Sequence, residues 1–234
     1  MHMFSVSPAF WKMFPEVKIA IITVHNINNQ DRTQVPDSVL QHANEIAPTL
    51  IPDEPISNNG IVQVWRDAFR KFKTDKGARS AIENLLKRAK NGNPVRSINP
   101  LVDIYNSVSL EYGFPVGCLD LDKVNGQLEL TVANGTEHFS AIGENDAEIA
   151  LLGEVIYRDD TDVTSRQWAW RDSSRTEVTE TTKNVVMYME CLKPEWQVQY
   201  RNAIACLESR LKHYLNTTCT ITFVSIAKSS TQFN

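Results

Sequence analysis

The hydrophobic spacing of this chain changes at Gly113, from helical repeats before it to short strand-like runs after it. Apolar side chains recur every three or four residues around Trp65 and around Leu86, which is typical of helices with one buried face. Asn99 and Pro100 begin a third helix, because asparagine caps a helix and proline is tolerated in its first turn. After Gly113, apolar runs between turn residues predict strands at 116–119, 127–132, 154–157, 166–170 and 184–189.

This order of segments predicts an α+β fold, an irregular mixed β-core flanked by helices. Outside the run of strands, the sequence predicts a strand over 17–24, helices over 36–47 and 194–215, a strand over 218–226 and a loose tail over 227–234. No internal repeat or low-complexity linker interrupts the chain. We therefore expect a single domain over residues 1–234.

The apolar runs and the cysteines indicate whether the chain enters a membrane, is secreted or binds a metal. No run approaches the roughly 18 apolar residues of a transmembrane helix, and the first 14 residues lack the features of a signal peptide. We therefore expect a cytoplasmic protein with no membrane partner. The four cysteines form no C-x-x-C pair and have no histidines at metal spacing, which favours reduced thiols and no metal or other cofactor.

Positive charge is concentrated in residues 62–96. The chain has a net charge of −4, yet this segment holds ten basic and three acidic residues, so it carries +7 and the remainder −11. Such segregation is what a phosphate-binding face requires, although solvated basic faces of two helices would give the same pattern. The candidate phosphate contacts are Arg66, Lys71, Arg79, Lys87, Arg88 and Lys90.

Two tryptophans follow an arginine at alternate positions of the predicted strand that begins at residue 166. Arg166, Trp168 and Trp170 would then share one face, with Gln167 and Arg171 on the other. Tryptophans beside an arginine could sandwich a nucleobase or an aromatic amino acid. They could equally belong to the core, as large aromatic side chains often do. No G-x-S-x-G, H-E-x-x-H, P-loop or dinucleotide-binding motif is present.

Residues 97–126 read SINPLVDIYNSVSLEYGFPVGCLDLDKVNG, and this segment resembles the B3/B4 editing domain of the phenylalanyl-tRNA synthetase beta subunit. The family positions are matched in order and spacing by Asn99, Pro100, Asp103, Asn106, Gly113, Pro115 and Asp120. A looser match continues to Glu190. Stand-alone B3/B4 proteins resemble the chain over nearly its full length, including Trp65-Arg66, residues 80–86 and residues 166–171.

The resemblance implies a B3/B4-like core over 97–192, preceded by a strand and basic helices over 1–96 and followed by a helix and strand over 193–234. In the synthetase, this domain hydrolyses tRNA esters of the wrong amino acid, typically tyrosine. Its pocket asparagine and proline fall on Asn106 and Pro115, but its histidine falls on Gly117. The carboxylate that recognises tyrosine falls near Glu190, two residues out of register, so that Tyr188 competes for it. The fold should transfer, and the tyrosine specificity should not.

These residues lead to one expected function and two alternatives. We expect binding of tRNA or aminoacyl-tRNA, not DNA, with ester hydrolysis in trans by a positioned water. Asn106, Gly117 and Arg171 would be catalytic. The substrate contacts would be Asp103, Pro115, Arg166, Trp168, Trp170 and Glu190. The alternatives are a non-catalytic module for tRNA or an amino acid, and an interaction protein with a decayed pocket. Asp103 could instead bond to nearby loops, and Gly117 could mark a β-bulge.

Overall fold

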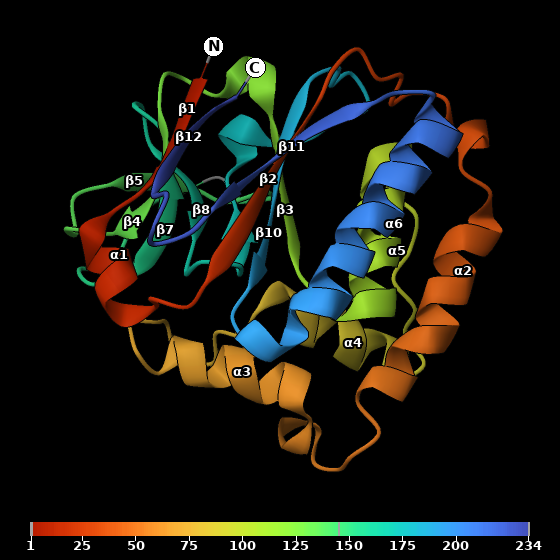
Figure 1. Ribbon diagram of the computed structural model, residues 1–234, viewed down its shortest axis with the longest axis horizontal. Coiled ribbons are helices and arrows are strands. Elements are labelled where there is room, and N and C mark those ends of the chain that lie inside the picture. Colours follow the sequence, from red (N-terminus) through yellow and green to blue (C-terminus); the bar gives the residue numbers. More distant parts are fainter. Residues whose placement is uncertain (1, 145, 234) are drawn as a thin grey trace.

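The computed structural model describes residues 2–144 and 146–233, and its described residues form two main β-sheets with helices packed around them (Figure 1). The helices are α1 (Pro8–Met13), α2 (Asp37–Ile46), α3 (Gly60–Phe69), α4 (Ala81–Lys90), α5 (Pro100–Tyr112) and α6 (Gln197–Leu215). The strands are β1 (His2–Val6), β2 (Lys18–Val24), β3 (Val116–Asp120), β4 (Leu128–Val132), β5 (His138–Ser140), β6 (Ala147–Ile149), β7 (Val155–Arg158), β8 (Val163–Arg166), β9 (Arg171–Asp172), β10 (Val185–Cys191), β11 (Cys219–Val224) and β12 (Ser230–Phe233). The predicted α+β fold with a mixed β-core and flanking helices is confirmed.

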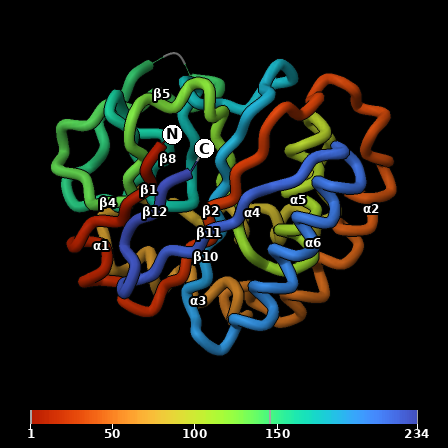
Figure 2. Tube along the Cα trace, turned by 45° about the horizontal axis from the view of Figure 1, so that its top comes forward, coloured from red at the N-terminus to blue at the C-terminus, as the bar shows by residue number. Residues whose placement is uncertain are grey.

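The larger sheet has six strands in the order β12-β1-β4-β7-β8-β9, and the second has four in the order β11-β2-β10-β3. All pairs in the four-stranded sheet are antiparallel, whereas β1 and β4 pair in parallel. Consecutive strands β11 and β12 belong to different sheets, so the C-terminal hairpin passes from one sheet to the other. Figure 2 shows β1 and β12, from opposite ends of the chain, side by side.

The strands β2 and β10 are buried on both faces. Ile21 and Tyr188 point into the core between the two sheets, and Ile22 and Met187 point to the core beneath α5 and α6. Side chains alternate across a strand, so a strand covered on both faces reads as a continuous apolar run. This explains why residues 17–24 predicted a strand without a polar face.

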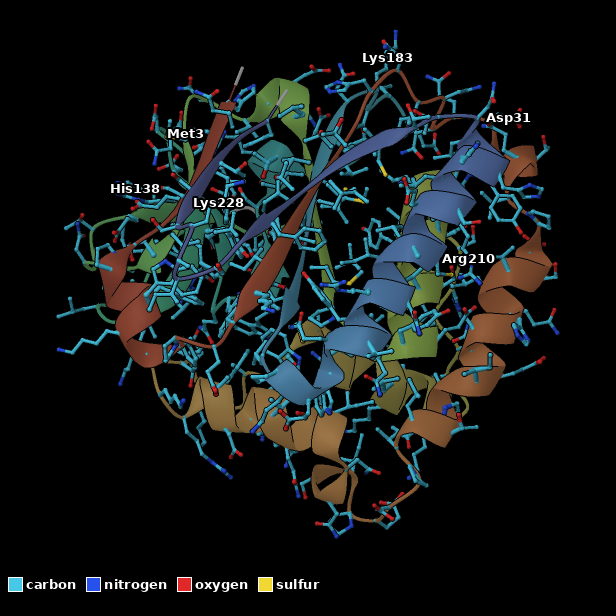
Figure 3. The ribbon with its side chains drawn as sticks, in the orientation of Figure 1. Met3, Asp31, His138, Lys183, Arg210 and Lys228 are labelled. Carbon is cyan, nitrogen blue, oxygen red and sulfur yellow. The ribbon has the colours of Figure 1, made fainter. Side chains whose placement is uncertain are left out.

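Helix α5 begins and ends where the sequence indicated. The Asn99 side chain accepts a hydrogen bond from the backbone N–H of Val102 at 3.0 Å, and Gly113 ends the helix with φ of 77°. Arg210 of α6, labelled in Figure 3, donates to the Glu111 carboxylate at 2.7 Å and so fixes α6 along α5. The two helices cover one face of the four-stranded sheet as a unit.

The predicted strand over 166–170 is wrong. Strand β8 ends at Arg166, and Gln167 and Trp168 have φ of 50° and 63°. A left-handed backbone at two successive residues reverses the chain, so β9 returns antiparallel beside β8. Arg166, Trp168 and Trp170 therefore do not share the face of one strand.

The loose tail predicted for residues 227–234 is also wrong over most of its length. Ser230–Phe233 form β12, which pairs with β1, and the Phe233 side chain is buried. Neither strand has a strong pattern of its own, and each is stabilised by a partner more than 200 residues away, as Phe233 and His2 illustrate. Among the described residues, no helix has the length and apolar character needed to cross a membrane.

Candidate functional site

Glu190 lies at the centre of an aromatic cluster between the sheets. Its Oε1 accepts hydrogen bonds from the Tyr157 hydroxyl at 2.5 Å and from the Trp168 indole N–H at 3.0 Å. All three side chains are at most 1% exposed. Burial raises the pKa of Glu190 to about 7, because a charged carboxylate is poorly solvated there. The resemblance implies that this carboxyl group recognises a hydroxyl of the ligand. In the structure it accepts a hydrogen bond from the hydroxyl of Tyr157 instead.

Trp168 belongs to the core. Its ring lies 4.9 Å from Phe10, 4.8 Å from Phe14 and 5.1 Å from Trp65, measured between ring centroids. A fully buried ring offers no face to a ligand from solution. Of the two alternatives raised by the sequence, core packing is therefore the one that the structure supports for Trp168, while Trp170 stays partly exposed.

Gly117 lies directly beneath the ring of Tyr188. The two residues face each other in the β3–β10 pair, and a Cβ added to Gly117 would meet Tyr188 Cε2 at 2.0 Å. The β3–β10 register runs without a break, so the β-bulge interpretation of Gly117 is wrong. Tyr188 also stacks on Tyr157, with ring centroids 4.0 Å apart. The space that a histidine side chain would take at position 117 is filled by this tyrosine pair.

Asp172 lies on β9, the outer strand of the six-stranded sheet. Its charge acts on Tyr188 of β10 and on Tyr105 of α5, and Ser165 of β8 faces it in the sheet. We call Tyr105, Gly117, Ser165, Asp172 and Tyr188 the edge junction. Burial raises the pKa of Asp172 to about 6, although a hydrogen bond from the Ser165 side chain opposes this rise. Sequence reasoning missed this residue, which carries no motif.

Arg166 and Arg171 are held in ion pairs. The buried Arg166 guanidinium donates to Glu154 at 2.8 Å through both Nε and Nη2 and also pairs with Glu148 and with Asp75 at 3.2 Å. Arg171 pairs with Glu144 and Glu148. Because alternate residues of a strand face opposite ways, Arg171 lies on the face of β9 away from Asp172. The structure therefore separates Arg171 from Gly117, with which the sequence grouped it.

The polar pair on α5 divides into one bonded and one free side chain. Asp103 accepts hydrogen bonds from the Ser97 hydroxyl at 2.5 Å and from the Ile98 backbone N–H at 2.8 Å, which is the structural role raised as its alternative. Asn106 is 9% exposed, and its amide has no hydrogen-bond partner among the described residues. Pro115 is buried just before β3. The described residues contain no cluster of His, Cys, Asp or Glu suited to a metal ion.

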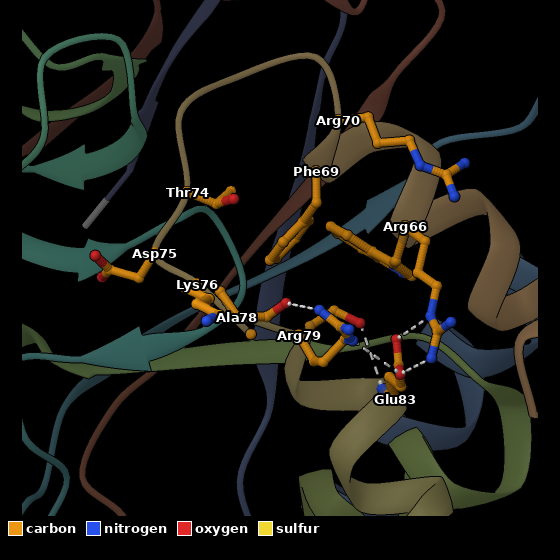
Figure 4. A pocket seen from close by; sticks show the side chains of 12 residues that line it. Arg66, Phe69, Arg70, Thr74, Asp75, Lys76, Ala78, Arg79 and Glu83 are labelled. Atoms are coloured by element: carbon orange, nitrogen blue, oxygen red, sulfur yellow. Dashed lines mark hydrogen bonds and ion pairs between the residues drawn. The ribbon is translucent and has the colours of Figure 1, made fainter.

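The basic segment forms a pocket of about 360 Å³ between α3, α4 and the loop that joins them (Figure 4). Arg66, Arg70, Lys76 and Arg79 line it together with Glu83. Arg66 donates to Glu83 at 3.1 and 2.6 Å, and Arg79 lies 3.5 Å from the same carboxylate. Two of the predicted phosphate contacts are therefore partly neutralised within the pocket.

The other basic residues of the segment differ in how many contacts their charged groups make with the rest of the protein. Lys90 donates to the Ile51 carbonyl at 2.8 Å and pairs with Glu54 at 2.7 Å, and Lys71 lies 5.1 Å from the centre of the Phe14 ring. The exposed cations of this segment without an ion pair among the described residues are Lys71, Lys73, Lys76, Lys87, Arg88 and Arg96. Lys87 and Arg88 lie in the last turn of α4 and are the predicted contacts most available to an anion.

Comparison with known proteins finds a family model that matches most of this chain. A family model described as the B3/4 domain matches residues 64–226. The beta subunit of phenylalanine–tRNA ligase from Pectobacterium atrosepticum is 28% identical over 123 residues, which cover 53% of this chain and 14% of that protein. The subunit from Shewanella oneidensis is 36% identical over 65 residues, 28% of this chain and 8% of that protein. The chain thus matches only a small part of these relatives.

A solved structure has a similar fold. It is the crystal structure of an N-terminal fragment of the phenylalanyl-tRNA synthetase beta subunit from Pyrococcus horikoshii, with a TM-score of 0.51 and 12% sequence identity. The alignment covers 92% of this chain and 49% of that one. At this identity, the likeness concerns the fold.

Proposed function

The chain belongs to the B3/4 domain family, and from that premise we propose that it binds tRNA through α3 and α4 and hydrolyses the ester of a mischarged aminoacyl-tRNA in trans. The relation to tRNA ligase beta subunits supports a tRNA-related function at the level of the family. The single observation that carries the proposal for this chain is the set of exposed, unpaired cations on α4 and the α3–α4 loop. An acidic protein with such a local basic face is suited to phosphate contacts.

The chemistry requires little from the protein. An aminoacyl ester is already activated, so the protein needs to orient water and to stabilise the oxyanion. Asn106 supports this role because its amide is free of protein partners, whereas Asp103 and Arg171 are occupied. The edge junction brings a carboxyl group and two phenols to the same region.

A second candidate function is a non-catalytic module that binds tRNA or an amino acid. The observation that favours it is the filled space above Gly117, where Tyr188 lies, together with the Tyr157 hydroxyl bonded to Glu190. A large aminoacyl side chain would have to displace these rings. If hydrolysis occurs, we therefore expect small side chains such as alanine or serine to be preferred over tyrosine.

One assay separates the two functions. The purified protein is incubated with tRNAs carrying alanine, serine or tyrosine, and release of the amino acid is followed under single-turnover conditions, with filter binding at low salt in parallel. Release of one amino acid well above the spontaneous rate is the expected result. Binding of tRNA without release would favour the non-catalytic module, and the absence of both would contradict the proposal.

Neutralising Lys87 and Arg88 to glutamine should weaken binding to all tRNAs alike, because phosphate contacts carry no sequence information. Each lost contact should flatten the log–log dependence of affinity on salt by about 0.7–0.9, so the double variant should lose about 1.5 from the slope. The matched control removes the same charge from α6, at exposed Arg201 and Lys212. Equal losses in both double variants would mean that total charge, and not this face, governs binding.

A further inference from the structure

In the pocket between α3 and α4, two guanidinium groups converge on one carboxylate oxygen. Arg66 lies in the last turn of α3, and Arg79 directly precedes Ser80, the N-cap of α4. Arg66 Nη2 donates to Glu83 Oε1 at 2.6 Å, and Arg79 Nε lies 3.5 Å from the same oxygen (Figure 4). The Glu83 side chain is only 4% exposed. One carboxylate thus holds two guanidinium groups side by side and compensates the charge of only one of them.

The lining of this pocket has an excess of positive charge. Its charged side chains are the cations Arg66, Arg70, Lys76 and Arg79 and the carboxylates Asp75 and Glu83. Asp75 points away from the two guanidinium groups in Figure 4 and pairs with Arg166 at 3.2 Å. Lys76 is exposed and has no ion pair within the described chain. The four cations therefore outweigh the two carboxylates by two positive charges.

The same pocket offers unused hydrogen-bond donors and an apolar wall. Arg66 bonds to Glu83 through Nε and Nη2, and Arg79 Nη1 donates to the carbonyl of the preceding residue at 2.6 Å. Arg66 Nη1 and Arg79 Nη2 have no hydrogen-bond partner in the part of the chain that the structure describes. Trp65 and Phe69 line the pocket beside these donors. A volume of about 360 Å³ is within the range of small-molecule pockets, so there is room for more than a phosphate group.

We propose that this pocket binds the phosphate monoester of a nucleotide, with the phosphate between Arg66, Lys76 and Arg79 and the rest of the nucleotide against the apolar wall. A phosphate monoester carries about −1.5 to −2 charges at pH 7, which matches the excess of the lining, whereas an internal phosphate of an RNA chain carries one. In tRNA the monoester is the 5′-terminal phosphate, in the acceptor stem that also carries the esterified 3′ end. The assignment to tRNA rests on the proposed function, and it makes the pocket the site that recognises the 5′ end.

The test compares one tRNA with its 5′-phosphate and the same tRNA after phosphatase treatment, by filter binding at a single salt concentration. The wild type should bind the phosphorylated form about tenfold more tightly, the effect of one hydrogen bond between charged groups. Arg79→Gln should reduce this preference to about twofold or less. Lys73→Gln is the matched control, because Lys73 lies in the same loop but does not line the pocket. It should weaken both forms alike and leave the preference unchanged.

Arg79→Lys guards against a misfolded Arg79→Gln protein, because it keeps the charge and should retain part of the preference for the 5′-phosphate. Equal binding of the two tRNA forms by the wild type would overturn this inference and leave tRNA binding intact. If neither form binds, the proposed function fails, and guanosine 5′-monophosphate is then titrated by calorimetry. Binding of this nucleotide that Arg79→Gln weakens about tenfold would keep the monoester site for a free nucleotide. No binding of the nucleotide would overturn the site as well.

Discussion

Replacing Trp168 with alanine should lower the free energy of unfolding by about 3–5 kcal/mol, the loss typical of deleting a fully buried aromatic side chain. The ring is 0% exposed and packs on Phe10, Phe14 and Trp65, so its removal leaves a cavity that these rings cannot readily fill. It also removes the indole donor at 3.0 Å from Glu190. Urea denaturation at pH 6 measures the difference.

Trp170→Ala is the matched control, because Trp170 lies two residues away and is partly exposed. We expect Trp170→Ala to lower the free energy of unfolding by less than half as much, because the Trp170 ring buries less apolar surface away from water. Trp168→Phe should fall between them, because it keeps most of the packing and loses only the donor. A Trp168→Ala protein as stable as the wild type, but defective in ligand binding, would restore the stacking interpretation that burial now opposes.

Local signals in the sequence located the helices well. Asn99, Pro100 and Gly113 act on the backbone within one turn of themselves, so the start and end of α5 follow from residues that are neighbours in the chain. The strands β2 and β10 were found for a similar reason, because both faces are buried and nearly every residue is apolar.

Long-range pairing could not be derived in the same way. Strands β1 and β12 are short and stabilised by each other across the whole chain, and nothing local in Ser230–Phe233 distinguishes a paired strand from a tail. The turn after Arg166 was missed because its left-handed residues are Gln167 and Trp168, which rarely adopt that conformation, and no glycine marks it.

The candidate site was found in part. The family resemblance singled out Gly117 as a departure, and the structure gives the physical reason, because the Tyr188 ring fills the space that a side chain there would need. Asp172 had no such signal. Its charge acts on Tyr105 and Tyr188, which are 67 and 16 residues away in the sequence, so only the folded arrangement relates the three residues.

Replacing Glu190 with glutamine should stabilise the protein at pH 8 by about 3 kcal/mol relative to wild type and have little effect near pH 4. The ordinary pKa of a glutamate is about 4.5, and burial raises that of Glu190 to about 7. As the pH rises between these values, the unfolded chain loses the proton while the folded chain still holds it. Unfolding therefore becomes more favourable over this range, and the wild type loses stability that glutamine, which does not titrate, keeps.

Glutamine is a close substitute for the protonated acid. Its Oε1 can accept the same hydrogen bonds from Tyr157 and Trp168, and its amide nitrogen replaces the Oε2 atom, which has no partner among the described residues. Urea denaturation of both proteins at half-unit pH steps gives the difference in unfolding free energy at each pH. The other titratable residues are the same in both proteins, so their contributions cancel in this difference. A difference that does not change with pH would contradict the raised pKa.

Glu154→Gln provides the opposite case on a second fully buried glutamate. Glu154 accepts two hydrogen bonds at 2.8 Å from Arg166, so its negative charge compensates a buried guanidinium. Arg166 keeps its ion pairs with Glu148 and Asp75, so we expect the loss of the Glu154 charge to cost about 1.5–3 kcal/mol, the range for a hydrogen bond to a charged group. The same substitution should therefore destabilise the protein at position 154 and stabilise it above neutral pH at position 190, because one carboxylate has a cation beside it and the other has only hydrogen-bond donors.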